Sequence, residues 1–206
     1  MVKLLVATNN PGKVREYEEL LVDLPQRPQI TFPAQEGLAP EVDESGATFE
    51  ENARIKALAY ARASNLLTLA DDSGLEVDAL GGEPGVHSAR YAGPHAGDAD
   101  RYRKLLDVLS GTPAGQRSAR FRCVVALALP DGTVYTTEGT CEGEIGFAPR
   151  GEFGFGYDPI FIVKGYGGLT MAELPPALKN QISHRARAMI AARPVLARLL
   201  ELAPYG

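Results

Sequence analysis

The sequence predicts an α/β protein with a sheet of mixed strand direction and flanking helices, and three observations support this class. A short apolar run over residues 2–7 leads directly into a helical pattern, so the chain opens as strand, loop and helix. Residues 121–137 change to strand-like composition around the turn 130–132, which is typical of a β-hairpin. The residues after 170 are helical again. This order argues against a purely doubly wound fold, and the length predicts a single domain over residues 1–206.

The first half of the chain carries two helix starts. One helix should begin at Pro11, because the side chain of Asn10 can cap it and proline suits the first helical position. A second helix should follow the capping box at residues 48–51 and continue to Asn65. A buried strand is then expected over residues 66–70.

The middle of the chain mixes loops, strands and one helix. The buried strand should end at Asp71-Asp72-Ser73-Gly74, and an amphipathic helix should occupy residues 98–109. Beyond the hairpin, strand-like sequence covers residues 141–148 and 159–163.

The C-terminal part should be helical. A second capping box at residues 170–173 marks one helix start, and Ser183 can cap a longer helix that reaches Leu202. Pro194 should either kink that helix or begin a new one, because proline has no amide hydrogen to donate inside a helix.

Composition argues against several classes of protein. The 206 residues contain 21 Lys and Arg against 26 Asp and Glu, so the net charge is −5, which argues against binding a nucleic-acid polymer through a broad basic face. The two cysteines are too few for a disulfide scaffold. The apolar runs are too short for a signal peptide or a membrane helix, so we expect a cytoplasmic protein without a membrane partner.

The turn Thr8-Asn9-Asn10-Pro11-Gly12-Lys13 suits a phosphate group. It joins a strand to a helix, where backbone N–H groups and the positive helix end favour anions, and Lys13 adds a full charge. It lacks the first glycine and the final hydroxyl residue of a Walker A loop. A capped helix start with a surface lysine is the alternative interpretation.

Two groups of acidic residues suggest a metal site. Asp71 and Asp72 follow a buried strand, where adjacent carboxylates repel each other and a bound cation would relieve the repulsion. Oxygen ligands without His or Cys select Mg²⁺ or Mn²⁺ over zinc. The loop acids Glu41, Asp43 and Glu44 are further candidates. The alternatives are an Asx turn at the two aspartates and a solvated loop for the other acids.

Residues 151–159 alternate glycine with Phe153, Phe155 and Tyr157, which is unusual for a core strand. Glycine would let a planar ligand approach the backbone, and Phe155 or Tyr157 could stack on it. A bulged hairpin with its aromatic side chains in the core explains the same pattern.

The C-terminal region is basic. Lys179, His184 and Arg185 place three candidate cations within seven residues, and no acidic residue lies between positions 177 and 200. Some of these cations belong to a solvated helix face, and His184 taken alone is more often structural than functional.

Considered as a set, these motifs resemble the noncanonical purine NTP pyrophosphatases, the ITPase or Ham1-like family. The resemblance spans residues 6–187, and the motifs fall in the family's order. They are Ala7-Thr8-Asn9-Asn10 with Gly12-Lys13, Glu44 to Ala53 with Lys56, Ala70 to Leu75, Pro84-Gly85 with Ser88 to Tyr91, Gly154 to Pro159, and Ser183-His184-Arg185.

The resemblance implies hydrolysis of ITP, dITP and XTP to the monophosphate and pyrophosphate with Mg²⁺, for which Mn²⁺ is a possible substitute. It also implies an elongated mixed sheet with two lobes around a central cleft, and a homodimer. Two alternative functions stay open. One is a pyrophosphatase for other modified or pyrimidine nucleotides, and the other is a sensor that binds nucleotides without cleaving them.

The same resemblance assigns roles to individual residues. It makes Asp72 the catalytic carboxylate and a metal ligand, and Glu44 and Asp43 align loosely as further ligands. It places the triphosphate on the turn from Thr8 to Lys13. The other residues it assigns to the substrate are Lys56, Ser73, Phe155, Gly156, Tyr157, Asp158, Lys179, His184 and Arg185.

The chemistry agrees with these assignments. Cleavage between the α and β phosphates needs charge neutralisation and a positioned water molecule, and it needs no covalent nucleophile. Donors from His184, Arg185 or the backbone would reward the 6-keto group of inosine or xanthine, and adenine would leave those donors unpaired.

Overall fold

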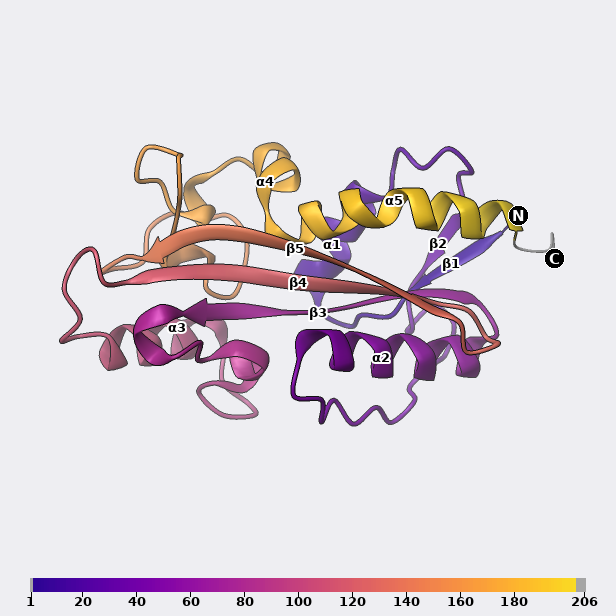
Figure 1. The fold of residues 1–206 in the computed structure, drawn as a ribbon, viewed down its shortest axis with the longest axis horizontal. Coiled ribbons are helices and arrows are strands. Elements are labelled where there is room, and N and C mark those ends of the chain that lie inside the picture. Colours follow the sequence, from indigo (N-terminus) through magenta and orange to yellow (C-terminus); the bar gives the residue numbers. More distant parts are fainter. Residues whose placement is uncertain (1, 203–206) are drawn as a thin grey trace. The chain divides into compact units, whose positions relative to one another are not determined.

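The computed structural model describes residues 2–202, which contain a six-stranded sheet in the order β2-β1-β3-β4-β5-β6 (Figure 1). The strands are β1 (Lys3–Val6), β2 (Gln29–Thr31), β3 (Leu67–Val77), β4 (Ser118–Ala128), β5 (Val134–Ile145) and β6 (Phe161–Val163). β1 is parallel to both β2 and β3, whereas β6 is antiparallel to β5. The predicted α/β class with a mixed sheet is therefore confirmed.

Five α-helices accompany the sheet within the described residues. They are α1 (Pro11–Leu20), α2 (Phe49–Ser64), α3 (Asp98–Val108), α4 (Pro176–Ile182) and α5 (His184–Leu202). None of the helices within residues 2–202 is both long and apolar enough to cross a membrane.

The chain divides into two compact units, and each unit is assembled from segments that are distant in sequence. Unit 1 comprises Met1–Asp72, Cys123–Gly139 and Arg185–Gly206. Unit 2 comprises Ser73–Arg122 and Thr140–His184. The expectations of a single domain and of a central cleft stay predictions.

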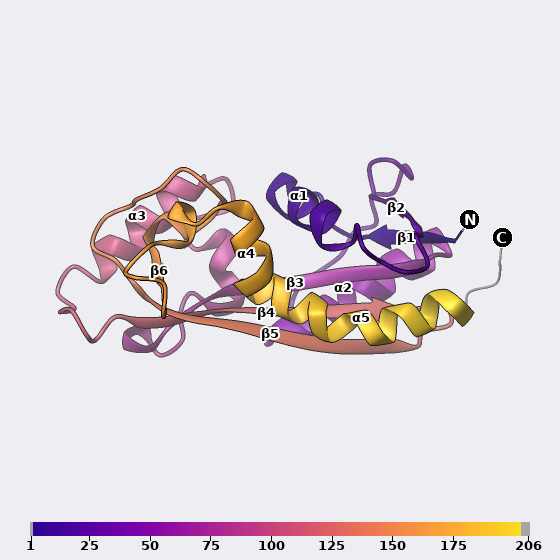
Figure 2. The same cartoon turned by 90° about the horizontal axis from the view of Figure 1, so that it is seen from above.

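Helices cover both faces of the sheet within unit 1. Side chains of α1 and α5, such as Tyr17 and Met189, share one buried cluster with Leu4, Leu69 and Val125 of the strands. α2 lies on the opposite face of these strands, as the two views in Figures 1 and 2 show. The strands of unit 1 are thus covered on both sides, which explains their nearly continuous apolar sequence.

Both predicted helix starts in unit 1 are confirmed. The Asn10 side chain accepts hydrogen bonds from the backbone of Gly12 and Lys13, at 2.8 and 3.2 Å. At α2 the capping box is complete, and the helix ends at Asn65, which takes the left-handed conformation with φ 56°.

Unit 2 has a core of its own. Leu105 and Leu109, at the end of α3, pack in one cluster with Phe121, Phe161 and Tyr157. The predicted helix over residues 98–109 is confirmed, with its end one residue earlier.

The structure corrects one strand end and narrows two helix predictions. β3 does not end before Asp71 but continues to Val77, because β4 still flanks it where its pairing with β1 stops at Leu69. The capping box at residues 170–173 begins a single 3-10 turn. No new helix begins at Pro194, which lies inside α5.

Candidate active site

The two adjacent aspartates of β3 have different environments. Successive side chains of a strand point to opposite faces, and the contacts of these two side chains follow that rule. Asp71 contacts Lys13 of α1 and Arg185 of α5, whereas Asp72 contacts Asn52 of α2. The pair that the sequence presented as one acidic motif is therefore divided between the two faces of the sheet.

Asp71 is a buried anion held by two cations. Its side chain is 1% exposed, and its Oδ2 lies 2.9 Å from Lys13 Nζ and 3.1 Å from Arg185 Nη2. Burial alone would raise the pKa of Asp71, but Lys13 and Arg185 outweigh it and hold the pKa well below its ordinary range. Arg185 also donates to Glu16 Oε2 at 2.5 Å. This cluster is internal and fully charged.

Asp72 is half-buried, and its carboxylate is hydrogen bonded to a neutral amide. Its Oδ2 accepts a hydrogen bond from Asn52 Nδ2 at 3.0 Å. Burial raises the pKa of Asp72, and the cations Lys13 and Lys56 offset that effect only in part. A carboxylate with a raised pKa accepts a proton more readily than an ordinary aspartate does, which suits a general base.

Lys56 connects the acidic loop to β3. Its ammonium lies 3.0 Å from Glu44 Oε1 and donates to the backbone oxygen of Asp71 at 3.2 Å. Glu41 and Asp43, on the same loop, are exposed. Of the three loop acids, Glu44 is therefore the one that these contacts tie to the strand carrying Asp72.

The residues at this position fit a hard divalent cation bound together with a substrate. Residues 2–202 hold no group of three or more His, Cys, Asp or Glu side chains able to bind a metal on their own, so Asp72, Glu44 and Asp43 do not form such a cluster. Asp72 and Glu44 are oxygen donors, and Mg²⁺ is commonly bound by one or two carboxylates with phosphate oxygens and water in the other positions. The donor set suits that mode of binding.

The turn from Thr8 to Lys13 lies in unit 1, next to the start of α1. The N–H groups of Gly12 and Lys13 are already bonded to the Asn10 side chain, and the Asn10 N–H is bonded to Thr8 Oγ1 at 3.2 Å. Lys13 reaches past the turn to Asp71. In this conformation the cation at the turn is Lys13, and the capped N–H groups are not available to a phosphate.

The glycine-aromatic segment forms a tightly bonded loop in unit 2. Asp158 Oδ2 accepts hydrogen bonds from the Phe155 backbone at 2.9 Å and from Lys179 Nζ at 2.6 Å. The Lys179 ammonium lies 4.9 Å from the centre of the Phe155 ring. Asp158 and Lys179 thus form a buried ion pair that closes the loop beneath the Phe155 ring.

Two further anchors fix this loop. The Gly156 N–H donates to Asp98 Oδ2 at 2.7 Å, at the start of α3. Tyr157 is buried, and its hydroxyl donates to the Ser88 backbone oxygen at 2.9 Å. The Tyr157 ring belongs to the core, and its stacking on a ligand stays a prediction. Phe155 is half-buried and is the more accessible candidate for stacking.

Replacing Gly154 with alanine is expected to disrupt this loop, and Gly156→Ala provides a matched control. Both glycines have positive φ, +79° and +64°, so both substitutions carry backbone strain of about 1–2 kcal/mol. Only at Gly154 would the added Cβ collide with Asp158, 2.1 Å from its Oδ2, whereas nothing lies within 4 Å at Gly156. Urea unfolding should show a larger loss in the free energy of unfolding for Gly154→Ala than for Gly156→Ala. Equal losses for the two variants would contradict the collision with Asp158.

Three further predicted residues, His184, Ser73 and Arg185, each have a different environment. The ring of His184 stacks on Phe121 with centroids 4.7 Å apart, and both belong to unit 2. Ser73 is half-buried on β3 in unit 2. Arg185 belongs to unit 1, is 1% exposed and is bound to Asp71 and Glu16. The predicted contacts of His184, Ser73 and Arg185 with a substrate stay predictions.

Sequence reasoning missed three residues that support the site. Asn52 bonds Asp72, Glu16 bonds Arg185, and Asp98 bonds the Gly156 N–H. For Asn52 a signal was present, because it is a polar residue one helical turn before Lys56 on a helix face otherwise rich in alanine. Glu16 and Asp98 carry no comparable signal, since each looks like an ordinary surface acid.

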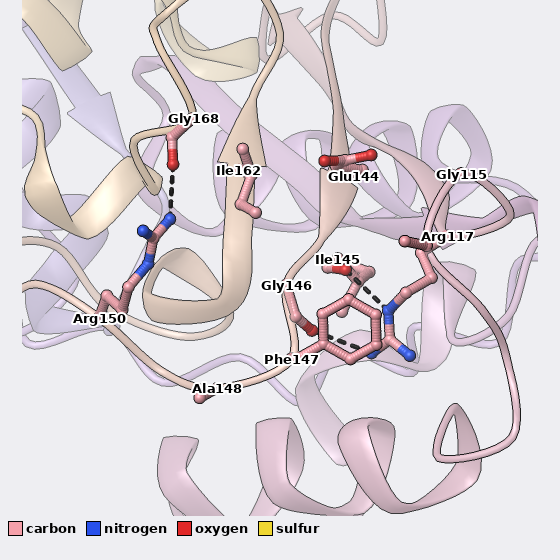
Figure 3. Close-up of a pocket in the computed structure, with 11 residues that line it drawn as sticks. Gly115, Arg117, Glu144, Ile145, Gly146, Phe147, Ala148, Arg150, Ile162 and Gly168 are labelled. Carbon is pink, nitrogen blue, oxygen red and sulfur yellow. Dashed lines mark hydrogen bonds between the residues drawn. The ribbon is translucent and has the colours of Figure 1, made fainter.

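A cavity of about 390 Å³ in unit 2 contains none of the predicted site residues in its lining (Figure 3). Arg117 is buried at its edge and donates to the backbone oxygens of Leu109, Ile145 and Gly146. The Phe147 ring covers the guanidinium, 4.4 Å from centroid to Cζ. Arg117 therefore ties the residue after α3 to the end of β5, which is a structural role.

Comparison with known proteins gives a consistent result. The Ham1 family model matches residues 4–195 of the chain. A dITP/XTP pyrophosphatase from Bacillus subtilis is 51% identical over 189 residues, which cover 92% of this chain and 94% of that protein. A dITP/XTP pyrophosphatase from Methylococcus capsulatus is 53% identical over 189 residues, which cover 90% of this chain and 92% of that protein.

Solved structures agree. A HAM1 protein from Coxiella burnetii superposes with a TM-score of 0.85 at 43% identity, and the match covers 96% of this chain and 100% of that chain. The Staphylococcus aureus Ham1 protein superposes with a TM-score of 0.82 at 41% identity, over 96% of this chain and 99% of that chain.

Proposed function

Because this chain belongs to the Ham1 family, we propose that it hydrolyses noncanonical purine nucleoside triphosphates, namely ITP, dITP and XTP, to the monophosphate and pyrophosphate. It is a nucleoside-triphosphate pyrophosphatase, a hydrolase that removes such nucleotides from the nucleotide pool. One observation of the site carries the proposal: Asp71 is paired with the cations Lys13 and Arg185, whereas its neighbour Asp72 is hydrogen bonded to the neutral amide of Asn52. A protein that only bound phosphate would not need the second carboxylate.

Asp72 acts in this proposal as the base that accepts a proton from the attacking water. Its raised pKa makes it a stronger acceptor than an ordinary aspartate, and the Asn52 hydrogen bond orients its carboxylate. Lys13, fixed by Asp71, and Lys56, fixed by Glu44, supply positive charge near the same strand. Positioning and charge neutralisation are the two demands of phosphoryl chemistry.

Pyrophosphatases of this kind generally depend on a metal ion, and we propose Mg²⁺, with Mn²⁺ as a substitute. Asp72 and Glu44 would hold it, and Asp43 is the weaker candidate because it is exposed. When bound, the ion would neutralise phosphate charge and polarise a phosphoryl oxygen. Glu44 is tied to the strand that carries Asp72, since Lys56 contacts Glu44 and donates to the backbone oxygen of Asp71.

The base is proposed to be recognised through donors and one aromatic face. Unit 2 supplies the half-buried Phe155 ring over the Asp158–Lys179 pair, and His184. Arg185 is the other donor proposed for a 6-keto oxygen. Adenine would present an amino group to such donors and leave them unpaired, which is how polar pockets discriminate strongly.

Pyrophosphate release measured with Mg²⁺ tests the proposal. ITP, dITP and XTP should be cleaved faster than dUTP, dTTP and GTP at equal concentration. Faster cleavage of dUTP or dTTP would favour a pyrimidine pyrophosphatase instead, and binding without release would favour a nucleotide sensor. A homodimer is a further proposal from the family resemblance, and sedimentation measures it. A cytoplasmic location is a proposal from the short apolar runs of the sequence.

A further inference from the structure

We propose that Asn52 is a positioning residue for the reaction, which orients the carboxylate of Asp72 and ties it to the loop that carries Glu44. The inference rests on the proposed function and deepens it, because Asn52 is buried and would act through Asp72. Its basis is the buried side-chain amide of Asn52, in which both the nitrogen and the oxygen are hydrogen bonded.

Asn52 is 2% exposed on α2 and connects two elements. Its Nδ2 donates to Asp72 Oδ2 at 3.0 Å, and its Oδ1 accepts from the Gly46 backbone N–H at 2.8 Å. An amide has one donor end and one acceptor end. With the amide reversed, oxygen would face the carboxylate and NH₂ would face an N–H group, so only one orientation satisfies both partners.

A second side chain of α2 makes a parallel connection. Lys56 lies four residues after Asn52, hence on the same face of the helix, and contacts Glu44 and the Asp71 backbone oxygen. Both side chains therefore join the loop at residues 44–46 to β3 at residues 71–72. The loop and the strand are held at two successive turns of one helix.

The helix start that carries Asn52 is itself well fixed. Glu51 and Thr48 form the complete capping box, and Glu51 Oε2 also accepts from the Ala47 N–H at 2.6 Å. At Gly46 an added Cβ would lie 2.7 Å from Asn52 Oδ1, so the loop approaches the amide as closely as a glycine allows. A supporting residue is effective when its own surroundings are locked in this way.

This support matters because a carboxylate rotates easily about its last torsion, which has only broad preferences. The Asn52 amide, itself fixed by the Gly46 N–H, restricts that rotation. Supporting residues that orient a reactive or metal-binding side chain are commonly worth about 10–100-fold in activity.

Two substitutions test the proposal. Asn52→Asp keeps the shape and the acceptor for Gly46, but it places an oxygen against Asp72. Asn52→Ala removes both bonds and adds no charge. We expect kcat for ITP or XTP to fall about 10–100-fold in each. Calorimetry with an uncleavable α,β-methylene triphosphate and Mg²⁺ should give a Kd for Asn52→Ala within about threefold of wild type, because this change adds no charge and leaves Glu44, Lys13 and Lys56 in place.

Thr48→Ala is the matched structural control, since it weakens the same helix start without contacting Asp72. Its thermal midpoint should fall, and its kcat per folded molecule should stay within about twofold of wild type, because the bonds of Asn52 to Asp72 and Gly46 do not involve the Thr48 side chain.

The proposal is overturned if the Asn52 variants keep wild-type kcat, if Thr48→Ala loses as much kcat as they do, or if analogue affinity falls as far as kcat. An inactive wild type overturns the proposed function itself, whereas an active wild type with unaffected Asn52 variants overturns only the positioning role.

Discussion

Replacing Asp72 with asparagine is expected to lower kcat by about 10²–10⁴-fold while the protein stays folded. The amide keeps the shape of the side chain but cannot accept a proton from water at neutral pH. Stability should change little, because Asp72 is half-buried and its raised pKa means that the surroundings do not favour its charge. Steady-state pyrophosphate release gives kcat, and circular dichroism verifies the fold.

The pH profile adds a second signature of Asp72. Because burial raises the pKa of Asp72 in the free protein, the proton-accepting form is lost at a higher pH than for an ordinary aspartate, so wild-type kcat/KM, which reports the free enzyme, should fall on the acidic side earlier than a pKa near 3.9 would predict. The residual activity of Asp72→Asn should lack this limb. Asp131→Asn, the same change in an exposed turn, is the control. Near-normal turnover by Asp72→Asn would remove Asp72 from the catalytic role.

Local signals predicted the parts of the fold that local interactions determine. The Asn10 cap and the capping box at residues 48–51 are complete in the structure, since their donors and acceptors lie within three residues of one another. The extension of β3 past Asp71 could not be predicted in the same way. It depends on β4 as a neighbour, and β4 begins about forty residues later in the chain, at Ser118.

The same distinction applies to the site. The acidic motif was visible in the sequence, but the different roles of Asp71 and Asp72 were not, because the partner that helps to neutralise Asp71 is Arg185, 114 residues away. Tyr157 is a similar case, since its hydroxyl is bonded to Ser88, 69 residues away. Residue types at the site follow from sequence motifs, whereas their charge states and directions follow from contacts between distant segments.

Replacing Asp71 with asparagine should mainly lower the free energy of unfolding, and any effect on the reaction should follow from that loss. The change removes the carboxylate paired with Lys13 and one of the two paired with Arg185, whose side chains are 14% and 2% exposed; Arg185 keeps its bond to Glu16. Breaking a buried ion pair by removing one partner commonly costs about 3–5 kcal/mol. Urea unfolding at pH 7 measures the loss, and a loss below about 1 kcal/mol would contradict a stabilising role for Asp71.

The stabilisation by Asp71 should depend on pH. The pKa of Asp71 is lowered in the folded protein, so its contribution to the free energy of unfolding is present at neutral pH and declines as the pH falls below the ordinary value of about 3.9. The difference between wild type and Asp71→Asn should therefore narrow in acid. If Asp71→Asn does not fold, the double variant Asp71→Asn with Lys13→Met should recover part of the loss, because it also removes the cation that was paired with Asp71. Asp72→Asn should not lower the free energy of unfolding in this way. The raised pKa of Asp72 means that its ionisation opposes folding at neutral pH. Equal changes in the free energy of unfolding for Asp71→Asn and Asp72→Asn would show that the division of the pair between the faces of the sheet has no energetic consequence.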